Sequence, residues 1–210
     1  MPESLDRLYS DMCSDINSST PHVPRIRLAY ALVWQRFMAA LSQNAGSNDQ
    51  CFLNIIHSTR HLFERPHYIG NAVYSAYTRQ TTAQLDEASI RQLAQTIGSS
   101  MHTVSLSVWL EQMRVLQDPE RYAKYLTVFA SPSAKQLTVS NISRLKFFSV
   151  DFGFGAPVHA TAYPMLVPGF SVWHPLSASG GLHILWNMPG SVAETLRNDS
   201  LFTRYVDFLF

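Results

Sequence analysis

Hydrophobic positions recur at helical spacing over the first forty residues of the chain. Leu5, Leu8, Met12 and Ile16 lie three or four positions apart, which predicts a first helix over residues 3–16. A second helix is expected within residues 20–41, because apolar residues again repeat every three or four positions. Its buried face is predicted to hold Ile26, Tyr30, Val33, Phe37 and Leu41.

After residue 50 the pattern changes to short apolar runs, which are typical of strands. Strands are expected at 52–56, 72–77, 137–141, 165–167, 170–173 and 182–187. Helical spacing returns from residue 82, with a break predicted at Gly98-Ser99-Ser100. Two more helices should begin near Asp118-Pro119 and Pro189-Gly190, since proline fits a first helical turn. This order of elements predicts an α/β fold with a mixed sheet flanked by helices.

Composition and charge narrow the classes of function. The 210 residues are enough for one domain of ordinary size, so 1–210 is expected to be a single domain. A net charge of +1 gives no electrostatic basis for binding nucleic acid or an acidic membrane. No apolar stretch is long enough to span a bilayer, and the first residues lack the apolar core of a signal peptide. We therefore expect a cytoplasmic protein.

The two cysteines, Cys13 and Cys51, fall in a predicted helix and a predicted strand. Their spacing does not match that of metal ligands, and no cluster of histidines accompanies them. They are predicted to be buried free thiols, and no metal site is expected.

The run Ser149–Pro157, which reads SVDFGFGAP, is the most specific motif. It follows, in order, Ala31-Leu32-Val33-Trp34, the strand 51–60 that ends in an arginine, the Tyr68–Ala72 loop and the strand Leu137–Arg144. Together these five elements resemble the C-terminal lobe of the BAHD acyltransferases, whose signature is DFGWG, and the style is that of fungal secondary metabolism. The resemblance implies a single lobe with a fold like that of chloramphenicol acetyltransferase.

The histidine motif of that family is missing from this sequence. Family members use the first residue of HxxxD as general base, yet none of the eight histidines here has aspartate four positions later. The resemblance therefore implies a half-length protein that contributes the acyl-donor channel of a coenzyme A-dependent O-acyltransferase. Acyl-CoA is the implied co-substrate, with no tightly bound cofactor, and this chain alone is predicted to be inactive in acyl transfer.

The expected binding partners follow from the same family resemblance. A hydrophobic small molecule is the expected substrate, and the uncovered face of the lobe should bind a complementary HxxxD-bearing lobe or a second copy. The alternative is a repurposed lobe, which acts as a cyclase or isomerase on a hydrophobic metabolite or as a non-catalytic binding protein.

Several residues are assigned by the resemblance. Ser140, Asn141 and Ile142 match positions that border the acyl-donor channel, with Ile142 where the family has a tryptophan. Phe154 is an aromatic candidate for the lining of the channel. For Ser140 and Asn141, ordinary strand hydrogen bonding is the alternative to ligand binding.

Asp151 and Arg60 match the structural ion pair of the family. An unpaired member of such a buried pair costs about 3–5 kcal/mol. Gly153 and Gly155 are predicted to adopt backbone torsions that a side chain forbids. The catalytic residue stays unassigned, with His159 and His174 as candidates for a base and a structural or surface role as the alternative for each.

Overall fold

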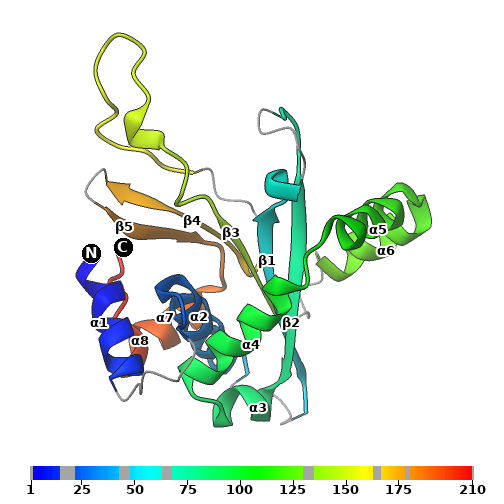
Figure 1. Cartoon of the computed structure of the whole chain (residues 1–210). Helices are drawn as coiled ribbons and strands as arrows, with labels where there is room; N and C mark the ends of the chain where they lie inside the picture. Colours follow the sequence, from blue (N-terminus) through cyan, green and yellow to red (C-terminus); the bar gives the residue numbers. More distant parts are fainter. Residues whose placement is uncertain are drawn as a thin grey trace.

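A mixed sheet runs through the middle of the molecule (Figure 1). The computed structural model describes residues 2–14, 22–42, 48–62, 68–129, 135–162, 167–177 and 180–209. The strands are β1 (Gln50–Ser58), β2 (Val73–Thr81), β3 (Gln136–Asn141), β4 (Phe170–Ser177) and β5 (Gly180–Trp186). They lie in the order β2-β1-β3-β4-β5. The inner pairs β1–β3 and β3–β4 are parallel and the outer pairs are antiparallel, which confirms the predicted mixed sheet.

Alternation along the strands gives the sheet two different faces. Leu53, Val139 and Trp173 are fully buried and belong to the core that the helices cover. The residues between them, such as Asn54 and Ser140, point to the opposite face because successive side chains of a strand alternate. The face toward the helices is therefore mainly apolar, with Ser171 and Asn141 as polar members, whereas the other face carries groups such as Asn54 and Ser140.

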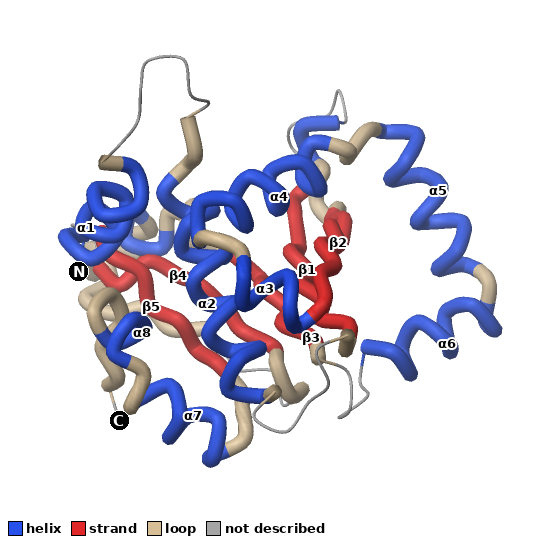
Figure 2. The backbone as a smooth tube through the Cα atoms, turned by 90° about the horizontal axis from the view of Figure 1, so that it is seen from below, coloured by secondary structure: helices blue, strands red, loops and turns tan. Residues whose placement is uncertain are grey.

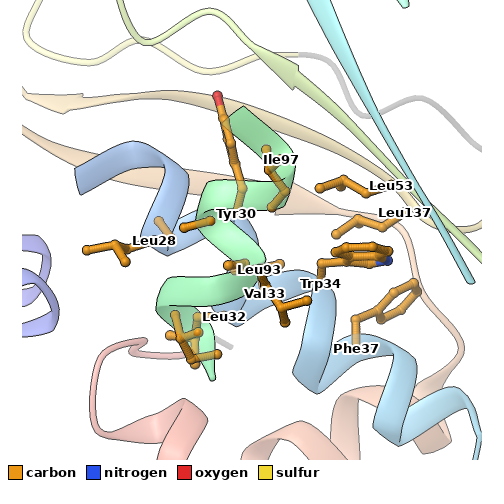
Figure 3. Close-up of a cluster of buried hydrophobic side chains, with 14 of the residues drawn as sticks. Leu28, Tyr30, Leu32, Val33, Trp34, Phe37, Leu53, Leu93, Ile97 and Leu137 are labelled. Atoms are coloured by element: carbon orange, nitrogen blue, oxygen red, sulfur yellow. The ribbon is translucent and has the colours of Figure 1, made fainter. Parts of the chain in front are cut away.

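The apolar face is covered by helices from both ends of the chain. These are α1 (Pro2–Cys13), α2 (Arg25–Leu41), α3 (Thr82–Glu87), α4 (Ile90–His102), α7 (Gly190–Arg197) and α8 (Ser200–Thr203). Figure 2 shows α2 across the middle of this layer, with α1, α4 and α7 around it. Side chains of α2, including Trp34 and Phe37, pack with Leu93 of α4 and Leu137 of β3 (Figure 3). The predicted apolar face of the second helix is confirmed at Tyr30, Val33 and Phe37, all of which are buried.

Two further helices lie beside the sheet rather than on it. The hairpin of α5 (Leu106–Gln117) and α6 (Pro119–Phe129) projects away from β2 (Figure 1). The indole N–H of Trp109 donates to the carbonyl oxygen of Val73 at 2.9 Å, and Gln112 Oε1 accepts from the backbone N–H of Ser75 at 3.4 Å. Side chains of α5 therefore form hydrogen bonds with backbone groups of β2. Because β2 is an edge strand, a second chain could otherwise pair with these groups. The side chain of Asp118 accepts hydrogen bonds from backbone N–H groups in the first turn of α6, as expected for a helix that begins at Asp118-Pro119.

One predicted helix boundary is wrong. The break expected at Gly98-Ser99-Ser100 lies inside α4. The helices are interrupted instead at 103–105, before α5, and at 88–89, before α4. Ser89 and Gln92 form a capping box at the second of these, in which each side chain accepts from the backbone N–H of the other residue. Gly98 allows the Arg27 side chain to lie close to α4, because a Cβ atom would lie 2.5 Å from its guanidinium nitrogen. A helical glycine can thus mark a close contact rather than an end.

The remaining elements agree with the sequence in existence and type. The strand expected at 72–77 is longer as β2, and that expected at 170–173 is longer as β4. The strand expected at 165–167 falls largely outside the described residues. Both cysteines are free and buried, as predicted. Among the described residues no helix is both long enough and apolar enough to cross a membrane.

Candidate functional site

The candidate wall of a donor channel lies at the end of β3. Ser140 pairs with Ile56 of β1 and with Val172 of β4, and it lies on the face opposite to the helices. Within the part of the chain that the structure describes, no hydrogen bond involves its hydroxyl group. Ser140 is half-buried. Its ligand-binding role stays a prediction.

Asn141 has a different environment, because its side chain is already engaged with the helix layer. Its Nδ2 donates to the Tyr30 hydroxyl at 2.5 Å, and its Oδ1 accepts from the backbone N–H of Ser143 at 2.9 Å. The Tyr30 ring lies edge-on against Trp173, with centroids 5.0 Å apart. Figure 3 shows the Tyr30 side chain extending from α2, with its hydroxyl oxygen at the far end. Asn141 therefore positions the turn after β3, and this outcome favours a structural role over ligand binding.

Burial governs the chemistry of this tyrosine. It raises the pKa of Tyr30 to about 12, although the Asn141 hydrogen bond and the nearby Arg144 charge act in the opposite direction. The phenol is neutral near pH 7 and remains available as a hydrogen-bonding partner. Tyr30 is thus a support for the wall rather than a base.

Ile142 begins the segment that leaves the sheet. Its backbone N–H donates to the carbonyl oxygen of Trp173 at 2.8 Å, so the main chain is fixed to β4 while the side chain is half-buried. An isoleucine has no side-chain N–H, so this position cannot donate to an oxyanion as an indole could.

The segment 142–162, which we name the arm, extends from the end of β3 and includes the short 3-10 helix η2 (Phe147–Ser149). Figure 1 shows it rising from the sheet on the side away from the helix layer. Three apolar side chains on it are almost fully exposed, namely Phe152 at 84%, Phe154 at 98% and Val158 at 100%. Phe154 therefore lines no channel within the described chain, and its assignment as a lining residue requires a partner surface.

The DFGFG run forms a small closed turn within the arm. Gly153 and Gly155 both have φ near +95°, a conformation that L side chains rarely adopt, so the predicted torsional role of both glycines is confirmed. Their backbone N–H groups donate to Asp151 Oδ1 at 2.7 and 3.0 Å. The carboxylate of Asp151 thus accepts hydrogen bonds from the backbone N–H groups that, in an open glycine loop, could bind a ligand phosphate.

The expected ion pair between Asp151 and Arg60 is not formed among the described residues. Arg60 opens the short 3-10 helix η1 (Arg60–Leu62) after β1 and donates to the carbonyl oxygens of Gly70 at 2.7 Å and Tyr68 at 3.4 Å. Each side chain is instead engaged by its own loop. The physical reason is that the arm carries Asp151 away from the sheet, where backbone donors of the arm itself replace the guanidinium.

The two candidate histidines differ in burial. His159 is exposed on the arm, whereas His174 on β4 is 1% exposed. His174 Nδ1 lies 3.1 Å from the carbonyl oxygen of Pro175, which favours the tautomer with the proton on Nδ1. Its Nε2 is buried and has no hydrogen-bond partner among the residues that the structure describes.

A third histidine joins this group, and sequence reasoning missed it. His183 on β5 pairs directly with His174, and the two ring centroids are 4.7 Å apart. Burial, followed by the neighbouring His174 and His159, lowers the pKa of His183. The signal was present in the sequence, because two strands joined by a short glycine-containing connection form a hairpin that places equidistant residues opposite one another. Within the described ranges no three metal-ligating side chains cluster, so these histidines do not form a metal site there.

Comparisons with known proteins can now be set beside this geometry. A family model described as "Transferase family" matches residues 4–167. The chain belongs to this transferase family, the BAHD acyltransferases. The comparison with curated proteins gives no significant match.

Solved BAHD structures share the fold of this chain. TRI101 from F. sporotrichioides, complexed with coenzyme A and T-2, superposes with a TM-score of 0.77 at 18% identity over 99% of this chain and 49% of that chain. TRI101 from F. graminearum, complexed with coenzyme A and deoxynivalenol, gives 0.77 at 17% identity over 97% and 47%. Vinorine synthase gives 0.72 at 16% identity over 98% and 46%.

The coverage is as informative as the similarity. The chain spans about half the length of these solved relatives and matches them over nearly all of its own length. The sheet and its helices therefore have the fold of one BAHD lobe, as the sequence predicted.

Proposed function

We propose that residues 1–210 form one domain, equivalent to the C-terminal lobe of a BAHD enzyme, and supply one wall of a coenzyme A-dependent O-acyltransferase of secondary metabolism. The observation that carries this proposal is the match of nearly the whole chain to about half of TRI101. The wall comprises Ser140 and Ile142 at the end of β3, with Asn141 holding their turn in place. Phe154 joins the wall when the arm is covered by a second lobe.

The proposed reaction divides the chemistry between two lobes. A histidine of an HxxxD-bearing lobe removes the proton from an acceptor hydroxyl, whose oxygen then attacks the thioester carbonyl carbon of acyl-CoA. The tetrahedral oxyanion collapses, the C–S bond breaks, and the histidine returns the proton to the leaving thiolate. This chain would supply orientation and an apolar environment, while an oxyanion donor comes from a group other than Ile142.

The exposed arm supports the need for a second lobe. Phe152, Phe154 and Val158 place apolar area in water at a cost of about 25 cal/mol per Å² relative to burial. A surface of this kind fits a partner, either an HxxxD-bearing lobe or a second copy of the chain. A hydrophobic acceptor is supported by the T-2 and deoxynivalenol that are bound to the two TRI101 enzymes.

A cytoplasmic location is part of the proposal. Cys13 and Cys51 are both buried and free, which agrees with a reducing compartment.

A complementation experiment tests the two-lobe proposal. The chain is co-expressed with an HxxxD-bearing BAHD lobe, and alcohol-dependent release of the coenzyme A thiol is measured. Activity should require both polypeptides and should be lost when the HxxxD histidine is changed to alanine. Ser140→Ala in the active pair should lower kcat/KM, whereas Ser107→Ala, an exposed serine on α5, is the matched control. A Ser140→Ala pair with unchanged kcat/KM would remove Ser140 from the wall.

The pair of His174 and His183 supports a second candidate function. A stand-alone lobe acting as a cyclase or isomerase on a hydrophobic metabolite needs a group that moves a proton, and His174 Nε2 is an acceptor that no described residue engages. In this case the chain alone turns over its substrate and His174→Gln abolishes the reaction. Loss of activity in His159→Gln instead would assign the base to the arm.

A further inference from the structure

A cavity of about 680 Å³ lies between β5, the helices α1 and α2, and the C-terminal segment 205–209. Protein interiors are packed closely, and voids larger than a water molecule are few, so a volume of this size is not an ordinary packing defect. Pockets that hold small molecules fall in the same range of volume.

The walls of the cavity are apolar and come from distant parts of the sequence. Trp173 and Trp186 line its sheet side, and Leu32 of α2 and Phe208 of the C-terminal segment line other sides. Leu209, which also borders the cavity, is 60% exposed. Hydrocarbon is the chemistry that such walls bind, because each apolar group removed from water stabilises the complex.

A guanidinium gives the cavity a cationic group. Arg197, in the last turn of α7, borders the cavity, and its guanidinium lies over the Phe208 ring at 5.1 Å from the centroid. The ring holds the guanidinium at the edge of the apolar space, where its N–H groups can donate to a carboxylate. Asp207 also borders the cavity, so Arg197 is the one of these two charged side chains that attracts a carboxylate.

We propose that this cavity binds a long-chain carboxylate, with its hydrocarbon chain against Trp186 and its carboxylate at Arg197. The site is distinct from the donor wall, because Ser140 lies on the sheet face opposite to the helices, whereas the cavity lies among α1, α2 and α7. It is built by this chain alone, so the inference does not rest on the proposed acyl transfer.

Contact quenching of tryptophan tests the proposal. Stearate brominated in the middle of its chain is titrated into the purified chain below its micelle concentration, and fluorescence is recorded. Bromine quenches an indole only at close range, so a saturable loss of emission is expected from Trp186. Trp186→Phe should reduce the quenched fraction, since Trp34 and Trp109 do not line the cavity. Absence of saturable quenching in the wild-type chain overturns the proposal.

Filling the cavity supplies the decisive variant. Ala193 of α7 lines the cavity and is half-buried, so Ala193→Phe should occupy the space and weaken binding at least about tenfold, whereas Ala83→Phe on α3 is the matched control. Circular dichroism and urea midpoints establish that both variants are folded. Equal quenching in Ala193→Phe and wild type contradicts the site, because the fatty acid is then bound elsewhere.

The carboxylate end has its own test. Arg197→Gln should weaken binding of the brominated acid by about two- to fivefold while leaving its methyl ester unchanged, since Arg197 is partly exposed to water. Arg114→Gln on α5 controls for the lost charge. Unchanged affinity of the acid in Arg197→Gln refutes the assigned orientation. None of these titrations contains acyl-CoA or a second lobe, so their failure is separate from that of the acyl-transfer experiment.

Discussion

Two regions of the molecule differ in the interactions that stabilise them. These are the core beneath β3 and β4 and the arm that follows β3. In the core, Trp173 is 0% exposed, packs against Tyr30, and is fixed through its indole N–H to Ser171 at 3.0 Å. In the arm, Phe154 is 98% exposed, and Asp151 is satisfied by two backbone donors of the same turn. The core is stabilised by this chain, whereas the arm presents surface that another lobe can cover. The difference indicates that the stability of the isolated lobe depends on the core and little on the exposed arm.

The largest effect should separate these two regions directly. Trp173→Ala removes a fully buried indole, so the free energy of unfolding should fall by about 3–5 kcal/mol. Phe154→Ala should change it by no more than about 0.5 kcal/mol, because the ring is almost fully exposed. Urea unfolding followed by circular dichroism measures both. Similar losses in the two variants would show that the arm is packed on the body.

The next effect concerns the link between the core and the start of the arm. Asn141→Ala removes the bonds to Tyr30 and to the Ser143 backbone, and should cost about 1–3 kcal/mol of unfolding free energy. In a double-mutant cycle with Tyr30→Phe, the two changes should be non-additive, because they delete the same hydrogen bond. Full additivity would mean that Asn141 and Tyr30 act independently.

A smaller effect is expected from the residues of the family's ion pair. In the isolated chain, Asp151→Asn and Arg60→Gln should each change the free energy of unfolding by about 0.5 kcal/mol or less, because both side chains bond to their own exposed loops. The control is Asp86→Asn, an exposed carboxylate on α3. A loss of about 3–5 kcal/mol in either variant would instead be the signature of a buried ion pair.

The smallest effect is one of pH. Burial and the neighbouring His174 and His159 hold the pKa of His183 below its ordinary value near 6.5, so the unfolded chain binds this proton more tightly than the folded chain. Stability is complete above that value and falls as the pH drops through it toward the lower folded pKa. His183→Gln should reduce the slope of unfolding free energy against pH over this window. An unaltered slope in His183→Gln would assign the pH dependence to other groups.

The spacing of hydrophobic residues predicted the fold well for elements that bury one face in the core. The apolar face of α2 and the strands β1, β3 and β5 follow directly from spacing and short apolar runs, because these residues form the core itself. It failed at Gly98, which lies inside α4 close to the Arg27 side chain, because no single-sequence pattern reports such a contact. The capping box at Ser89 and Gln92 was a readable signal for the boundary before α4.

The candidate site was less predictable, because it depends on which side chains meet across the sheet. The sequence could place Ser140, Asn141 and Ile142 at one strand end, yet only the packing of α2 shows that Tyr30 engages Asn141. By contrast, the pairing of His183 with His174 was readable from the short glycine-containing connection between the two strands, and the register of β4 and β5 establishes it. The family resemblance predicted an ion pair between Asp151 and Arg60. In the described residues each side chain forms hydrogen bonds within its own loop instead.

The central claim is that this chain supplies a wall and not the proton acceptor of an acyltransferase. Acyl-CoA and a panel of hydrophobic alcohols are incubated with the purified chain, and release of the coenzyme A thiol is followed with a thiol reagent. We expect no alcohol-dependent release of the coenzyme A thiol above the rate without protein. Sustained release that is lost in either His159→Ala or His174→Ala would contradict the central claim, since the chain would then carry its own base.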